Sequence, residues 1–365
     1  MKTLIDTENN RQETSAPPQV SRSHTLVEKI VIVDGQGGCG KTMLSPIVSA
    51  LDRVELLAYA YELEYVCALK HLGKITDDTA ATMVCLLTDL QLYNSLMGRE
   101  TNFRFSDLSS VFNNANPWRY FKRIFSKGDE FIPERIAQEK PILQLTTHIL
   151  MGISEPLFRA LGERLVFIDM VRHPLYMIKQ LVLLEMDSLL KSGEKVNNFV
   201  RNFGLHIKYK DYEVPFYTHG WEELFVRSNN MEKAIYFIEH VARTGESAKQ
   251  RLRELYQSKI ITVPFERFVI NPWPYMEEIA QALGTKITAV TRRMMKKQNV
   301  PRRMYAEGIA LKIYRRCGWR PPEKGSDERK ELALRRQFVA ENASKEAMER
   351  FDKLCAEYEK QYMGQ

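Results

Sequence analysis

The sequence lacks any long apolar run, and its few cysteines follow no pairing pattern. No stretch of the 365 residues approaches the roughly 20 apolar residues that a membrane helix needs, and a polar tract stands where a signal peptide would have its apolar core. The five cysteines are odd in number and include no CxxC pair, which argues against a disulfide framework or a zinc site: Cys39, Cys67, Cys85, Cys317 and Cys355. We expect a cytoplasmic protein with reduced thiols that lie mostly in the core.

The chain also lacks a recognisable nucleic-acid-binding module, although it is basic. It has no zinc-finger spacing, no aromatic RNA-binding pattern and no basic region joined to heptads. The net charge of +7 and the pI near 9.0 nevertheless favour an acidic partner. Nucleotide phosphates, a sulfated or carboxylated substrate and an anionic membrane surface all fit this charge, whereas we expect no nucleic-acid partner.

Strand and helix patterns alternate along the chain, which predicts an α/β protein with a doubly wound parallel sheet flanked by helices. Four short, apolar and β-branched segments have the pattern of strands: Lys29 to Asp34, Pro141 to Leu145, Arg164 to Met170 and Lys259 to Pro264. A mainly helical insertion, at about residues 54 to 136, separates the first strand from the second.

The two ends of the chain have different patterns. Residues 1 to 26 are polar, aperiodic and include Pro17 and Pro18, so we expect a disordered tail. Residues 27 to 365 are then expected to form a single domain. Within it, Asp327 to Tyr362 carries apolar residues at a three-and-four spacing, which predicts an amphipathic C-terminal helix packed on the body.

A glycine-rich loop follows the first predicted strand and precedes a predicted helix. Its residues read GQGGCGKT: Gly35, Gln36, Gly37, Gly38, Cys39, Gly40, Lys41 and Thr42. They satisfy the pattern GxxxxGK[ST], in which backbone amides turn towards an anion, the lysine reaches the phosphates and the threonine hydroxyl binds phosphate or magnesium. We predict that this loop binds the phosphates of a nucleotide; the alternative is a turn that merely joins strand to helix.

Three further segments resemble the sulfotransferase family, which has a P-loop-type fold and takes its sulfuryl group from 3′-phosphoadenylyl sulfate. LVFIDMVRHPLYMIKQ is similar to the family's strand that ends in an arginine and a proline, here Arg172 and Pro174. LQLTTHILMGISEPLF resembles the motif that carries its catalytic histidine, here His148. ITVPFERFVINPWPYMEEIAQALG is similar to a late structural strand and turn, marked by Glu266 and Pro272.

The resemblance implies a role for each matched residue. Arg172 would bind the donor's 3′-phosphate, His148 would take the acceptor's proton, and Lys41 would offset charge on the leaving phosphate, with no metal required. The acceptor would be a small molecule or a glycan with a hydroxyl or amine. The sequence departs from the family pattern at two positions. Gln180 stands in place of a serine that helps to bind the 3′-phosphate, and Thr146 stands in place of a lysine near the reacting centre.

Other interpretations fit part of the same pattern. An ATP- or GTP-dependent kinase or NTPase would use Asp169, at the end of LVFID, to hold magnesium opposite Thr42. A non-catalytic nucleotide-binding protein is a further alternative. His148 can equally be a strand-end residue that hydrogen-bonds the backbone, and Arg172 can be half of an ion pair. Weaker substrate-binding candidates are Arg99, Arg104 and a basic cluster from Arg292 to Arg303.

Overall fold

A five-stranded parallel sheet forms the centre of the protein. The computed structural model describes residues 18–184, 190–191, 203–256, 259–309, 315 and 319–364. Neighbouring strands are all parallel, in the order β2-β3-β1-β4-β8. Their bounds are β1 Ile30–Asp34, β2 Ala58–Tyr59, β3 Leu143–Thr146, β4 Leu165–Val171 and β8 Lys259–Pro264. The predicted α/β fold and its four predicted strands are confirmed; the two-residue β2 is too short to show in the sequence pattern.

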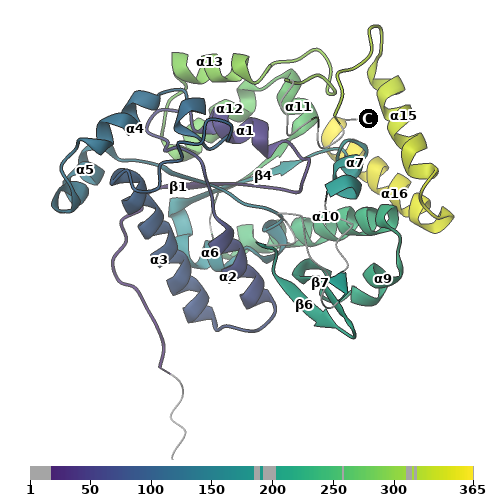
Figure 1. The fold of residues 1–365 in the computed structure, drawn as a ribbon, viewed down its shortest axis with the longest axis horizontal. Coiled ribbons are helices and arrows are strands. Elements are labelled where there is room, and N and C mark those ends of the chain that lie inside the picture. The colour runs from purple at the N-terminus through teal and green to yellow at the C-terminus, as the bar shows by residue number, and fades with distance from the viewer. Residues whose placement is uncertain are drawn as a thin grey trace, which may run out of the picture.

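Helices cover both faces of this sheet, which is why its strands are apolar on both sides. Val31 and Val33 of β1 share one core cluster with α1, whereas Ile30 and Ile32 share the other with α2, α3 and α6. Figure 1 shows α1, α12 and α13 on one side of the sheet and α2, α3 and α6 on the other. The bounds are α1 Lys41–Val48, α2 Tyr61–His71, α3 Asp77–Leu96, α6 Glu155–Leu161, α12 Trp273–Leu283 and α13 Ala289–Lys297.

The central strand β1 lies where the winding of the sheet changes direction. After β1 the chain adds β2 and β3 on one side, and it then adds β4 and β8 on the other. Open parallel sheets bind ligands in the crevice outside the carboxyl ends of the strands at such a point. The glycine-rich loop leaves β1 at this position, so the topology itself places the loop at the expected binding edge.

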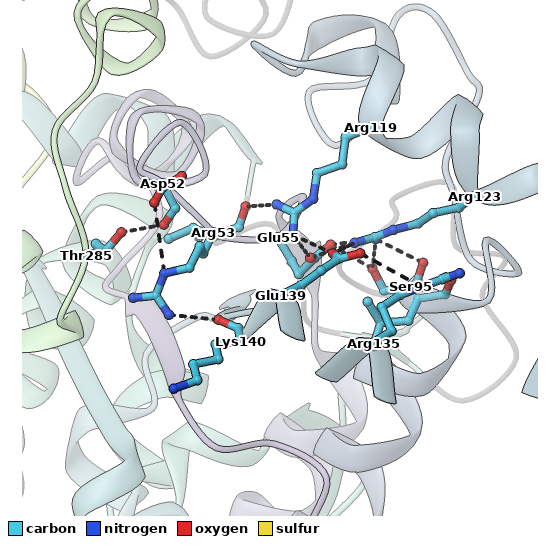
Figure 2. A network of polar contacts seen from close by, with 12 residues as sticks. Asp52, Arg53, Glu55, Ser95, Arg119, Arg123, Arg135, Glu139, Lys140 and Thr285 are labelled. Atoms are coloured by element: carbon cyan, nitrogen blue, oxygen red, sulfur yellow. Dashed lines mark hydrogen bonds and ion pairs between the residues drawn. The ribbon is translucent and has the colours of Figure 1, made fainter. Parts of the chain in front are cut away.

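The connection between α1 and β3 is mainly helical, as predicted. Besides β2, α2 and α3 it contains α4 Pro117–Ile124 and α5 Ile132–Glu139. Its anchor is the fully buried Glu55, which accepts hydrogen bonds from Arg119 at 2.6 Å and from Arg123 at 2.7 and 2.8 Å. Glu139 lies at 3.5 to 3.7 Å from the same two arginines (Figure 2). This ion-pair network joins α4 and α5 to the strand-like segment beside β3.

The C-terminal region is two helices and not the single helix predicted from residue 327 to 362. Helix α15 spans Glu328–Ala340, and α16 spans Lys345–Tyr358. The break has a local cause, because the Ser344 hydroxyl accepts a hydrogen bond from the amide of Ala347 and so begins a new helix. Both helices pack against α7, Pro174–Leu184, which follows β4.

The remaining elements include a long helix and a second, smaller sheet. The long helix α10 packs against α7 and α16. A small antiparallel sheet has the order β5-β7-β6 and was not predicted. The bounds are β5 Leu190–Lys191, β6 His206–Tyr209, β7 Tyr212–Pro215, α9 Glu222–Arg227, α10 Asn230–Leu255 and α11 Phe265–Ile270.

The segment before β1 contacts α3 through several hydrogen bonds, most of them to one carboxylate. Asp89 accepts hydrogen bonds from the side chain of Arg22 and from the amides of Leu26 and Val27. These contacts involve the C-terminal part of the predicted tail, whereas residues 1–17 lie outside the described residues. The division into a tail of residues 1 to 26 and one domain stays a prediction. Within the described ranges, no helix has the length and apolar character needed to cross a membrane.

Candidate functional site

Two glycines of the loop combine a positive φ with too little room for a Cβ. Gly35 has a φ of +145°, and a Cβ there would lie 2.4 Å from the carbonyl oxygen of Met170. Gly40 has a φ of +110°, and its Cβ would lie 2.5 Å from the ring of Phe265. Lys41 begins α1 directly after this turn, and its ammonium donates a hydrogen bond to the Gly35 carbonyl. The loop therefore has the strand-turn-helix form in which helix amides face an anion.

One cavity of about 350 Å³ brings the separated sequence motifs together. The predicted site residues that line it are Gln36, Gly37, Gly38, Gly40, Lys41, Thr42, His148 and Arg172. Gly35 and Cys39 instead face a second cavity behind the loop. Burial raises the pKa of the Cys39 thiol to about 11, so Cys39 stays protonated at neutral pH and contributes its backbone to the loop.

His148 is held in place from two directions. Its Nδ1 lies 2.9 Å from Oε1 of Glu64 in α2, and its backbone amide donates to the same oxygen. Asp34, at the end of β1, accepts hydrogen bonds from Thr147, Leu150 and Met151 on either side of the histidine. A carboxylate at Nδ1 keeps the proton on that nitrogen, so Nε2 is the nitrogen that can accept one.

Tyr61 lies beside His148 but is unsuited to act as a base. The two ring centroids are 5.8 Å apart and the rings are nearly parallel. Burial raises the pKa of Tyr61 above its ordinary value, so the phenol stays protonated at neutral pH. Of these two neighbouring side chains, His148 is the one that can take a proton from an acceptor.

Arg172 stands at the end of β4, between the glycine-rich loop and α11. Its Nη1 donates to the carbonyl of Gly38 at 2.8 Å, and its guanidinium carbon lies 3.9 Å from the centroid of Phe265. Burial lowers the pKa of Arg172, an effect that Glu266 opposes at 4.0 Å. Glu266 is itself occupied by the amide of His173 and the hydroxyl of Tyr358, so Arg172 is positioned for an anion without a full ion pair of its own.

Further cations line the same cavity, chiefly from the C-terminal half of the chain. With Lys41 and Arg172 they form a set of five: Lys41, Arg172, Lys179, Arg302 and Arg335. The carboxylates that line it are Glu64, bound to His148, and Glu307, which accepts from the amide of Arg303. This excess of positive charge suits a ligand with several negative groups.

Gln180 and Thr146 stand where the sulfotransferase pattern has a serine and a lysine, and only Gln180 lines the cavity. Gln180 lines the cavity, and its Oε1 lies 3.2 Å from the place a Cβ on Gly38 would occupy. Thr146 is buried beneath α1 and donates a hydrogen bond to the Ser45 hydroxyl. Gln180 is thus placed to contact a ligand beside the loop, whereas Thr146 is structural.

Asp169 projects away from the loop threonine. Val166, Ile168 and Met170 share the core cluster of α1, and Leu165 and Phe167 share the opposite one. Because strand side chains alternate, Asp169 faces the side opposite α1. There its carboxylate pairs with Lys249 of α10 at 2.9 Å. This geometry disfavours a magnesium ion held between Asp169 and Thr42.

Aromatic side chains make up much of the cavity lining. A group of six comes from α2, the segment around β6 and β7, and α10: Tyr61, Tyr65, Phe203, Phe216, Tyr217 and Phe237. His148 lines the same cavity, and its ring stacks near that of Tyr61. The cavity therefore combines cationic side chains with apolar aromatic surface and a histidine.

Comparisons with known proteins give a limited result. No protein-family model matches the sequence, and no curated protein matches it. Among solved structures the chain is similar to a sulfotransferase domain from the Synechococcus PCC 7002 olefin synthase, with 12% identity, a TM-score of 0.37 and coverage of 90% of this chain and 100% of that one. It is also similar to a Mycobacterium avium sulfotransferase, with 12% identity, a TM-score of 0.35 and coverage of 74% and 67%. The function is therefore inferred from the geometry of the cavity and not from these similarities.

The sequence patterns missed several residues of the cavity, and several of the candidates that they gave lie elsewhere. Glu64 and Arg335 sit in ordinary helical patterns that carry no motif, so only the fold reveals them. Arg99 stacks on Tyr93, and Arg104 pairs with an aspartate in an exposed loop, so neither lines this cavity. Cys317 lies outside the described residues, and the other four cysteines are free and buried as expected.

Proposed function

We propose that this protein is a sulfotransferase that moves a sulfuryl group from 3′-phosphoadenylyl sulfate to an acceptor hydroxyl or amine. One observation carries the proposal: the glycine-rich loop, Arg172 and His148 line a single cavity although they are far apart in the sequence. A loop that binds a nucleoside triphosphate needs neither an additional anion site at an arginine nor a histidine oriented by a carboxylate. In sulfuryl transfer the loop, Arg172 and His148 each have a role.

The donor's two charged ends match two parts of the cavity. The amides of the loop and the start of α1 would hold the 5′-phosphosulfate, with Lys41 beside the bridging oxygen. Arg172 would bind the 3′-phosphate through charge-assisted hydrogen bonds. Phe265 already makes a cation–π contact with this guanidinium, and Arg172 also bonds the Gly38 carbonyl, so little side-chain freedom would be lost on binding.

The chemical step needs little beyond positioning and charge. The acceptor oxygen or nitrogen attacks sulfur in line, and the bond from sulfur to the bridging oxygen breaks. His148 Nε2 takes the acceptor's proton, and Glu64 stabilises the resulting imidazolium across its 2.9 Å contact with Nδ1. Lys41 offsets the negative charge that builds on the leaving phosphate.

The aromatic lining favours a small-molecule acceptor over a glycan. Tyr65, Phe216 and Phe237 line the same cavity as His148. Such a surface stabilises an apolar or aromatic body more than a polyhydroxylated one, because burial of apolar area is the larger gain. We therefore propose an acceptor with an apolar body and one reactive hydroxyl or amine.

The magnesium-dependent kinase or NTPase is the less favoured alternative. That chemistry requires a carboxylate opposite Thr42, and Asp169 is instead paired with Lys249 on the other face of the sheet. We propose that donor binding and transfer proceed without magnesium.

A transfer assay tests this proposal. Purified protein is incubated with 3′-phosphoadenylyl sulfate and a panel of phenol, alcohol, amine and glycan acceptors, and release of adenosine 3′,5′-bisphosphate is measured. We expect acceptor-dependent release that is unchanged by a chelator. ATP consumption that needs magnesium, with no release of the bisphosphate on any acceptor, would point to the kinase or NTPase alternative.

A further inference from the structure

Two arginines from distant parts of the chain meet at the ring of Tyr176. Arg172 precedes α7 and Arg335 lies in α15, yet both line the cavity. Their guanidinium carbons are 5.1 and 4.4 Å from the Tyr176 ring centroid, within the range of cation–π contacts. The Tyr176 hydroxyl donates to Glu328 of α15 at 2.6 Å, which fixes the ring between α7 and α15.

One nitrogen of each guanidinium group, Nε, is unpaired among the described residues. The Nε atoms of Arg172 and Arg335 are both buried without a hydrogen-bond partner in the described part of the chain. The carboxylates beside them are at ion-pair distance only, Glu266 at 4.0 Å from Arg172 and Glu331 at 3.5 Å from Arg335. Buried donors that lack an acceptor are costly, so such donors in a cavity wall indicate a ligand acceptor.

The two positive charges also act on each other. Burial lowers the pKa of Arg172, and Arg335 lowers it further. Like charges brought together in a partly buried site are unfavourable unless an anion lies between them. A phosphate dianion has enough oxygen atoms to accept from both forks at once.

We propose that Arg335 and Arg172 together bind the 3′-phosphate of the donor, which makes the C-terminal helix α15 part of the donor site. This inference rests on the proposed function, since it assumes a donor that carries a 3′-phosphate. Gln180 and Lys179 of α7 line the cavity nearby. The subsite thus uses a second arginine, which comes from α15.

Calorimetric titration with two nucleotides tests the inference. Adenosine 3′,5′-bisphosphate carries the phosphate assigned to Arg335, and adenosine 5′-phosphate lacks it. We expect Arg335→Gln to weaken bisphosphate binding by about 10- to 100-fold, the range of a lost charge-assisted hydrogen bond, and to leave binding of the 5′-phosphate within about twofold. Arg336→Gln is the matched control, because Arg336 is exposed and paired with Asp352 at 2.6 Å.

The melting temperature separates a binding effect from a folding effect. Without nucleotide, Arg335→Gln should melt no lower than the wild type, because it removes one of two neighbouring like charges. The inference is overturned if Arg335→Gln keeps wild-type affinity for the bisphosphate, or if it weakens both nucleotides equally. A wild type that binds the two nucleotides equally would instead contradict the proposed donor, whatever Arg335 does.

Discussion

The His148→Ala variant is expected to lose about 10²- to 10⁴-fold in turnover, the usual contribution of a positioned base. Binding of adenosine 3′,5′-bisphosphate should stay close to that of the wild type, because His148 lies at the acceptor end of the proposed donor site. Initial rates of bisphosphate release with the best acceptor, together with calorimetric affinity, give both quantities. A loss in affinity as large as the loss in rate would remove His148 from the base role.

His206 provides a matched control for that experiment. It lines the same cavity from β6, and its Nδ1 contacts the carbonyl of Gly204 at 2.8 Å, whereas Nδ1 of His148 contacts a carboxylate. We expect His206→Ala to keep its turnover within a few-fold of the wild type. If His206→Ala loses turnover and His148→Ala does not, the two histidines have been assigned the wrong way round.

The Glu55→Ala variant is expected to lose about 3–5 kcal/mol of unfolding free energy, because it leaves buried arginine charge without its carboxylate. Arg123 has only 4% of its side chain exposed and pairs with Glu55 at 2.7 Å. Urea unfolding at neutral pH measures the loss. Glu139→Ala removes a carboxylate of the same network that is 42% exposed, and it should cost less than about 1 kcal/mol. Equal losses for the two variants would contradict a buried anchor at Glu55.

The effect of Glu55 should also depend on pH in a defined direction. Burial acts to raise the pKa of Glu55, but Arg123 and Arg119 outweigh it, and the pKa lies below the ordinary value of 4.5. A lowered pKa in the folded state gives stability that is fully present above the unfolded-state pKa and is lost as pH falls through the folded-state pKa. The difference between wild type and Glu55→Ala should therefore be largest at neutral pH and shrink in acid below pH 4.5.

Local patterns were enough to predict the sheet and the position of the glycine-rich loop at the end of β1. The segment Lys29 to Asp34 is apolar and β-branched and ends in glycine, and the structure forms β1 from Ile30 to Asp34. Such a strand is buried on both faces, so its composition alone identifies it. The position of His148 and Arg172 beside the loop also follows from sequence, because parallel strands end at the same edge of the sheet.

Contacts between distant helices could not be predicted in the same way. Glu64 reaches His148 because α2 packs on the sheet, and Arg335 reaches the cavity because α15 packs against α7. The sequence also could not show on which face of the sheet the Asp169 side chain lies, because an apolar run before an aspartate is the same for either face. Each of these features depends on packing between elements far apart in the chain.

Calorimetric titration of the wild-type protein tests the central claim most directly. Adenosine 3′,5′-bisphosphate and ATP are titrated separately, each with and without magnesium. A cavity built from the Lys41 loop and Arg172 for a 3′-phosphorylated donor predicts that the bisphosphate binds tightly and that magnesium does not change its affinity. Tight binding of ATP only with magnesium, and no binding of the bisphosphate, would contradict that account.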